Sequence, residues 1–236
     1  MSTITTRPRP SSTAPSASRA PVAVLGEQRI VIRGLSWDLY DRLSDAIGEG
    51  QHVHLAYDGK DLEIMSTGRF HEHYKELLGQ LVTTVTATLK IPREKLGETT
   101  WKRPEVARGL EADQCYYFAP EKMAADAEAR ARRSNLVADY PNPDLAIEVD
   151  LSQSQVDRPG IYAALQVAEV WRFDGEMVTI EQLRPDGSYA AAESSRFIPV
   201  RAEDIRHWLI GEDSSGGLEW ERRLAAWAQG LRREGT

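Results

Sequence analysis

The segment Pro143–Asp150 carries the residue types best suited to chemistry, because acidic and apolar side chains alternate along it. Strand side chains alternate between faces, so the apolar residues are predicted on one face and Glu148 and Asp150 on the other. Two carboxylates at neighbouring positions repel each other unless a counter-charge lies close. A hard cation with oxygen ligands is one natural counter-charge for buried carboxylates. The segment is therefore a candidate metal site.

An ordinary surface strand with a solvated acidic face would show the same alternation. The position of the segment between two predicted helical stretches favours an inner strand that is covered on both sides. Its apolar face has an evident partner in the long predicted helix His71–Lys90, where apolar residues recur every three or four positions.

A second acid, Asp113, lies in the predicted strand Glu111–Phe118 ahead of an aromatic run. An aspartate at a strand entrance is also common turn chemistry, which leaves a purely structural role open.

The elements that must position these acids form a mixed α/β pattern, with helices packed on a central mixed sheet. The Asp58-Gly59 and Asp174-Gly175 pairs predict hairpins. Ser36 is predicted to cap a helix whose buried stripe includes Leu39 and Tyr40. Further strands are expected at 29–33, 52–57, 61–65, 97–102, 169–173 and 177–183, and helices at 159–166, 203–210 and 218–233; residues 124–133 are expected to be an exposed helix or a loop.

The organisation along the chain predicts three parts. Residues 1–22 are rich in Ser, Thr, Pro, Ala and Arg and are expected to be a solvated tail. Residues 23–210 form the predicted domain, and residues 211–236 a linker with an amphipathic helix that carries Leu218, Leu224, Trp227 and Leu231.

Composition excludes several classes of protein. The net charge of -7 argues against a broad non-specific nucleic-acid binder, although it permits a local basic patch. Cys115 is the sole cysteine, so neither an intramolecular disulfide nor a cysteine zinc site can form, which is compatible with a reducing cytoplasm. No apolar run is long enough to span a bilayer.

The order of several motifs resembles the Uma-two family of restriction-endonuclease-like proteins, within the PD-(D/E)XK nuclease superfamily. The resemblance covers about residues 29–209. It rests on the motifs Asp61–Ser66, His71, Gly109–Tyr117, Pro143–Asp150, Asp157-Arg158, Ile161–Leu165 and Glu169–Arg172.

This resemblance implies a restriction-endonuclease-like core in which Asp113 and Glu148 bind Mg²⁺, with Mn²⁺ as an alternative ion. A backbone carbonyl near Val149 would assist. Asp150, beside Glu148 on the same face of the segment, is expected to be a third carboxylate. The bound ion would lower the pKa of a water molecule and stabilise charge on a phosphodiester oxygen.

The chain departs from the superfamily pattern where a lysine normally stands two residues after the glutamate, because Asp150 occupies that position. Members of the family place a lysine on the following helix instead, and Arg158 stands there in this chain. Arg158 can stabilise a phosphate by bidentate hydrogen bonding but cannot act as a general base. A simple salt bridge to Asp157 or to a site acid is an equally good interpretation.

His71, at the start of the long helix, is expected to line the site, whereas His52, His54 and His73 are expected to be structural or exposed. The stretch Trp101–Arg103 is a basic and aromatic patch that could touch a nucleic-acid backbone.

We therefore expect a Mg²⁺-dependent endonuclease that acts on DNA in the cytoplasm as a homodimer, since cutting two strands favours paired sites. The DNA substrate and the dimer follow from the resemblance. Two alternatives remain open: a catalytically silent nuclease fold that binds DNA or protein, and acids that hold a structural ion.

Overall fold

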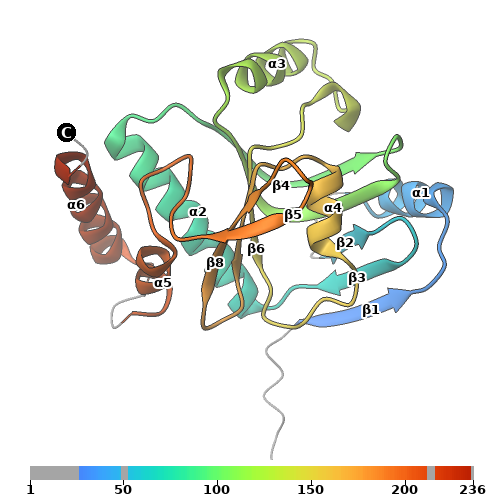
Figure 1. Cartoon of the computed structure of the whole chain (residues 1–236), viewed down its shortest axis with the longest axis horizontal. Helices are drawn as coiled ribbons and strands as arrows, with labels where there is room; N and C mark the ends of the chain where they lie inside the picture. The colour runs from blue at the N-terminus through green and yellow to red at the C-terminus, as the bar shows by residue number, and fades with distance from the viewer. Residues whose placement is uncertain (1–26, 49–52, 212–215, 235–236) are drawn as a thin grey trace, which may run out of the picture.

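The long apolar helix that the sequence predicts lies across one face of a mixed β-sheet, shown in the computed structural model in Figure 1. The structure describes residues 27–48, 53–211 and 216–234. The strands are β1 (Gln28–Ile32), β2 (Val53–Tyr57), β3 (Leu62–Ser66), β4 (Glu94–Arg103), β5 (Arg108–Tyr117), β6 (Leu145–Val149), β7 (Glu169–Phe173), β8 (Val178–Leu183) and β9 (Tyr189–Ala192). The helices are α1 (Trp37–Ile47), α2 (Arg69–Leu89), α3 (Pro120–Ala131), α4 (Arg158–Ala164), α5 (Ala202–Ile210) and α6 (Leu218–Glu234), with a 3-10 turn at Val137–Asp139.

The described strands form one nine-stranded sheet in the order β1-β3-β2-β5-β6-β7-β8-β9, and β4 pairs with β5 off this path. The pair β6 and β7 is parallel, and α4 supplies the crossover between these two strands. Both predicted hairpins are confirmed: β2 pairs with β3 and β7 with β8, and the turn glycines Gly59 and Gly175 have φ values of 91° and 99°. The mixed α/β fold expected from the sequence is confirmed.

Strand β5 has a fork along one of its edges. The pairs with β2 end at Leu110, and the pairs with β6 begin at Gln114. The opposite edge of β5 pairs with β4 from end to end. Asp113 therefore lies where the neighbouring strand changes from β2 to β6, a point at which side chains from both strands can converge.

Strand β5 also contains a β-bulge at this fork. A single residue of β4, Glu98, faces two residues of β5, Asp113 and Gln114. The alternation of side chains shifts by one position there: Ala112 and Cys115 both pack beneath α4, whereas Asp113 and Gln114 both reach residues of α2. The bulge thus turns the Asp113 carboxylate toward the long helix.

Two apolar clusters hold the sheet between its helices. The larger cluster joins α2, α5 and α6 to Leu145, Ile147 and Val149, so the predicted pairing of this strand face with the long helix is confirmed. The second cluster packs α4 against the other face of β5, β6 and β7. All five residues of β6 are buried, which confirms an inner strand covered on both sides.

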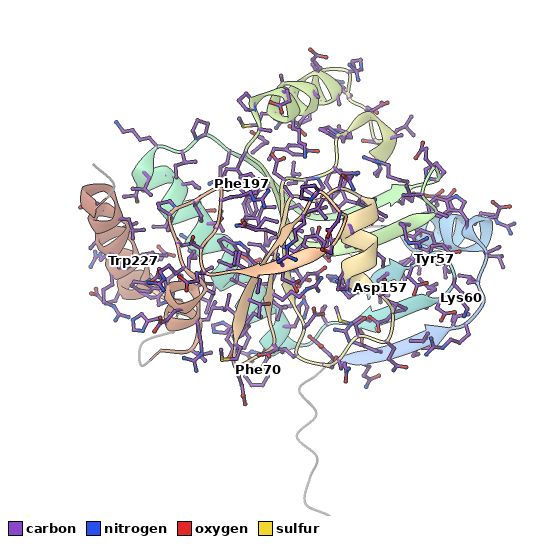
Figure 2. All side chains as sticks on the ribbon, in the orientation of Figure 1. Tyr57, Lys60, Phe70, Asp157, Phe197 and Trp227 are labelled. Carbon is purple, nitrogen blue, oxygen red and sulfur yellow. The ribbon has the colours of Figure 1, made fainter. Side chains whose placement is uncertain are left out.

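The C-terminal helix α6 packs against α2 and α5 (left side of Figure 1). Trp220, Leu224 and Ala228 are buried in the larger cluster, and Trp227, labelled in Figure 2, packs its ring against Trp208 of α5. The predicted linker at 211–217 lies partly outside the described residues, and the predicted tail at 1–22 lies entirely outside them.

Some local expectations are wrong. Leu39 is 48% exposed, because Tyr40 beside it takes the buried position on α1. Leu218 is also exposed, at the first residue of α6. Strand β9 and the 3-10 turn carry no alternation or cap strong enough to predict them. The stretch 124–133 belongs to α3, which starts earlier, at Pro120, a residue suited to the first turn of a helix.

Among the described residues, none of the helices combines the length and the apolar character that crossing a membrane requires.

Candidate metal and catalytic site

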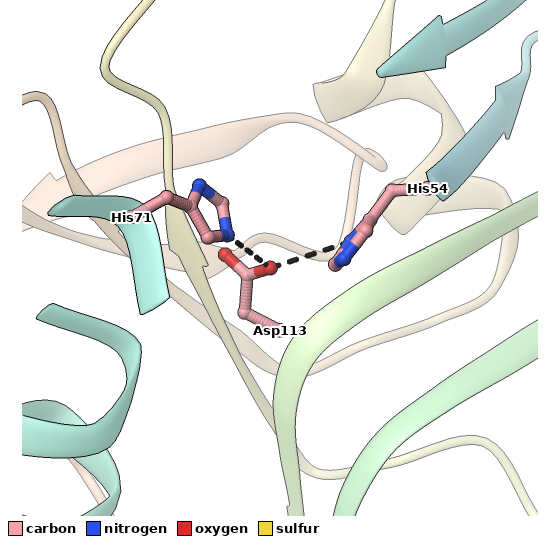
Figure 3. Close-up of side chains that lie close together, drawn as sticks. All are labelled: His54, His71 and Asp113. Carbon is pink, nitrogen blue, oxygen red and sulfur yellow. Dashed lines mark hydrogen bonds and ion pairs between the residues drawn. The ribbon is translucent and has the colours of Figure 1, made fainter. Parts of the chain in front are cut away.

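Asp113 is the centre of a buried polar cluster at the fork of β5 (Figure 3). Its Oδ1 atom lies 2.9 Å from Nε2 of His71 on α2 and 3.4 Å from Nδ1 of His54 on β2. Its Oδ2 atom accepts a hydrogen bond of 2.7 Å from the backbone N–H of Val149. Both carboxylate oxygens are thus engaged, and Asp113 and His71 are fully buried.

Each histidine of this cluster contacts a second carboxylate through its other ring nitrogen. Nδ1 of His71 lies 2.8 Å from Glu27, and Nε2 of His54 lies 3.0 Å from Glu98. Glu98 is the residue of β4 that faces the bulge, so the same irregularity that turns Asp113 also brings this glutamate to the cluster.

The charges of the cluster shift the pKa values of its members. Burial alone would raise the pKa of Asp113, but the hydrogen bond with His71 and the charges of both histidines hold it below its usual value. Burial lowers the pKa of His71, yet its bonds to Asp113 and Glu27 outweigh burial and raise that pKa to about 10. His71 is therefore a cation at neutral pH when no metal is bound.

Glu148 on β6 lies beside Asp113 but has a different set of partners. The guanidinium of Arg158 forms an ion pair with its Oε1 atom, and the hydroxyl of Tyr162 donates a hydrogen bond to the same atom. Burial raises the pKa of Glu148; the charge of Arg158 opposes that rise, and the charge of Asp113 adds to it. All three partners are buried, so this ion pair is shielded from water.

Asp150 follows β6 and connects the buried charges to the surface. It pairs with Arg29 at 3.0 Å and with Arg172 at 3.2 Å, and its side chain is 17% exposed. Arg172 lies over the ring of Tyr162 at 5.6 Å. A groove beside Asp150 is lined by the loop after β6, the turn after β7 and the exposed Phe70 (Figure 2); its lining residues include three acids and no basic side chain among the described residues.

The structure brings the predicted site residues together in two groups. Asp113 contacts His71, and Glu148 contacts Arg158, which is the salt bridge to a site acid considered from the sequence. Val149 takes part through its backbone N–H.

Sequence reasoning missed His54, Glu27 and Glu98. His54 was expected to be structural or exposed, and it is 1% exposed beside Asp113. Its position near the start of β2 gives no signal of this contact, because the contact depends on the pairing of β2 with β5.

The basic and aromatic patch at 101–103 is not available to a nucleic acid. Trp101 is 2% exposed. Lys102 pairs with Asp41 and Asp45, and Arg103 donates hydrogen bonds to the backbone carbonyls of Val137 and Tyr140.

Comparison with models of protein families assigns the chain to a family. Residues 37–204 match the model of the Uma2 family, described as "Putative restriction endonuclease". A search of curated proteins gives no match. The matched region contains Asp113 and Glu148, the bulge and α4, and it spans more than half of the chain. The fold, the order of the motifs and this match agree, and the chain belongs to the Uma2 family.

Proposed function

We propose that this protein is a divalent-metal-dependent endonuclease that hydrolyses phosphodiester bonds of DNA. The observation that carries the proposal is the pair Asp113 and Glu148, buried on adjacent strands of a restriction-endonuclease-like sheet with Arg158 against Glu148. Burying several charged groups in the middle of a sheet is unfavourable for stability, and titratable groups with shifted pKa values concentrate at functional sites.

The residues fit a divalent ion. Asp113, Glu148 and Asp150 offer carboxylate oxygens, which suit Mg²⁺ and Mn²⁺, and the backbone carbonyl of Val149 is a further candidate ligand. The ion would supply a water molecule of lowered pKa and a positive charge at the phosphate. Asp150 lies at the groove, where it is the first of these acids that a substrate would meet.

Arg158 would act on the phosphate rather than on the water molecule. Its guanidinium cannot deprotonate, but it can donate two hydrogen bonds to phosphate oxygens. To do so it must leave Glu148, and an ion at Glu148 would release it by replacing its charge. The ion pair of Arg158 with Glu148 would therefore belong to the site before an ion binds.

A second candidate function is a catalytically silent module of the same fold that binds DNA or protein. The arginine in place of a lysine favours it, and so does Glu148, whose charge Arg158 already compensates without any ion. A third possibility, a purely structural ion, predicts metal binding without cleavage.

The choice between these functions follows from plasmid nicking by the purified protein with Mg²⁺ or Mn²⁺. We expect cleavage that EDTA abolishes and that Asp113→Asn and Glu148→Gln each reduce by about 100-fold or more. Glu169→Gln is the matched control, because Glu169 is a fully buried glutamate on β7 outside the site. Cleavage that persists in both site variants would refute the enzyme proposal.

The homodimer and the cytoplasmic location belong to the same proposal. Paired sites suit cleavage of two strands, and a lone buried Cys115 suits a reducing compartment. Light scattering coupled to size-exclusion chromatography would give the mass of the particle, and a monomer both free and on a DNA duplex would refute the dimer.

A further inference from the structure

We infer that His54, His71 and Asp113 form a binding site for a first-row transition-metal ion, of the class of Co²⁺ and Zn²⁺, in preference to Mg²⁺. The inference rests on the proposed function for the role of the ion. Binding itself depends only on the geometry of the three side chains and is tested without a nuclease assay.

Two of the three separations between the ligand atoms match those of ligands on one ion. One atom from each residue lies within 4.8 Å of the other two. Two ligands held about 2.1 Å from one ion, at tetrahedral or right angles, lie about 3.0 to 3.4 Å apart. The separations of Asp113 Oδ1 from the two imidazole nitrogens are 2.9 and 3.4 Å. A small movement of His54 would complete the site.

Carboxylates behind both histidines match the surroundings of metal-binding imidazoles. Such a histidine usually directs its second ring nitrogen at a carboxylate or a carbonyl, which fixes the tautomer and makes the ligating nitrogen more basic. Glu27 occupies that position for His71, at 2.8 Å, and Glu98 for His54, at 3.0 Å. The arrangement of carboxylate, histidine and candidate ion thus occurs twice.

His54 supplies an independent indication. Its side chain is 1% exposed; Nε2 lies 3.0 Å from Glu98, but Nδ1, 3.4 Å from Asp113, makes no hydrogen bond among the described residues. Buried polar atoms without hydrogen bonds are rare in folded proteins and usually mark a missing partner. An ion between His54 and Asp113 would be that partner.

The chemistry of the ligands selects the class of ion. Mg²⁺ prefers oxygen ligands and retains several water molecules, whereas imidazole suits Zn²⁺ and later first-row ions such as Co²⁺ far better. Two of the three ligand atoms here are imidazole nitrogens. An ion can approach from the side of Glu98, whose side chain is 26% exposed.

The test is metal binding by the full chain after treatment with EDTA. We expect one equivalent of Co²⁺ to bind, with an absorption spectrum that reports nitrogen ligands, and Zn²⁺ to displace it. A 1,000-fold excess of Mg²⁺ should leave the Co²⁺ spectrum unchanged. Absence of Co²⁺ and Zn²⁺ binding, or displacement of Co²⁺ by Mg²⁺ at similar concentration, would overturn the inference.

Variants assign the ligands. His54→Gln should weaken Zn²⁺ binding more than about 100-fold, and Glu98→Gln, which leaves the three ligands in place, about 10- to 100-fold. His73→Gln is the control, because His73 is an exposed histidine on the same helix as His71. Equal Zn²⁺ affinity in the wild type and His54→Gln would show binding elsewhere and refute the site. If His54→Gln does not fold, as judged by circular dichroism, the Glu98→Gln result decides.

Glu148→Gln separates this inference from the proposed nuclease. We expect this variant to lose cleavage about 100-fold but to lose Zn²⁺ affinity far less than His54→Gln, since Glu148 is not one of the three ligand residues. Selective metal binding without plasmid cleavage would refute the nuclease alone. Cleavage supported by Mg²⁺ in a protein that lacks selective Co²⁺ binding would refute the inference alone.

Discussion

The surroundings of Asp113 and of Glu148 differ more than their positions do. The two acids lie on the adjacent strands β5 and β6, and both are buried. The counter-charge of Asp113 comes from two imidazoles, whereas that of Glu148 comes from a guanidinium. An imidazole can lose its proton and then bind a metal; a guanidinium can do neither.

The counter-charge of Asp113 can therefore be exchanged for a metal ion, whereas the counter-charge of Glu148 cannot. At Asp113 a metal ion can take the place of protons on His71 and His54. At Glu148 an ion must displace Arg158 altogether. The stability of the metal-free protein should therefore depend most strongly on Arg158. The four predictions below run from the largest expected effect to the smallest.

Arg158→Ala should have the largest effect on stability. It leaves Glu148 buried without its counter-charge, and removing one partner of a buried ion pair lowers the free energy of unfolding by about 3–5 kcal/mol. Urea unfolding followed by tryptophan fluorescence measures this loss. The double variant Arg158→Ala/Glu148→Gln should recover a large part of it; a single-variant loss below about 1 kcal/mol would contradict the comparison.

His71→Gln should have the next largest effect, about 1.5–3 kcal/mol, because it removes a charged hydrogen-bonding partner of Asp113 and Glu27. The effect depends on pH. The pKa of His71 is raised from 6.5 to about 10, so its stabilising contribution is fully present below pH 6.5 and is lost as pH rises through about 10.

Urea unfolding in EDTA at several pH values measures the difference between the wild type and His71→Gln. That difference should shrink between pH 6.5 and 10. A difference that grows with pH would show that His71 is buried as the neutral form.

Tyr162→Phe should lower the free energy of unfolding by about 1.5 kcal/mol. It removes one hydrogen bond to Glu148 but leaves the ion pair with Arg158 intact. Tyr57→Phe is a useful reference in the same unfolding experiment, because the Tyr57 hydroxyl donates to the neutral backbone carbonyl of Leu35 and its loss should matter less. Equal effects of the two changes would argue against an ionised Glu148.

Asp150→Asn should have the smallest effect on stability, below about 1 kcal/mol. The side chain is partly exposed, and both of its arginine partners keep another carboxylate: Glu63 for Arg29 and Glu181 for Arg172. In the plasmid assay the same change should reduce cleavage strongly if Asp150 binds the catalytic ion. A stability loss above about 2 kcal/mol with unchanged cleavage would assign Asp150 a structural role.

The sequence predicts those parts of the fold in which local pattern and tertiary packing agree. The apolar residues of β6 and the apolar face of α2 have complementary periodicities, and they pack together as expected. The Asp-Gly turns specify their hairpins through a residue that tolerates positive φ. The pairing of Arg158 with a site acid also follows from the short distance along the chain between β6 and α4.

The remaining features depend on contacts between distant segments. Nine consecutive residues of β5 are buried, so its pattern shows no alternation from which the bulge could be predicted. His54 reaches Asp113 because β2 and β6 share one edge of β5. Nothing in the residues around His54 reports this sharing, which is a property of the sheet.

The bulge in β5 makes the site depend on a count of residues as well as on their types. Inserting one residue beside Glu98 in β4 would give Asp113 and Gln114 a separate partner each, and the apolar pattern of the chain would hardly change. Asp113 would then continue the regular alternation from Cys115 and point toward α4, away from His71. Two sequences with nearly the same composition and the same motif letters could thus differ completely in this site. A one-residue insertion or deletion within β4 or β5 can therefore change this site while every acid is retained.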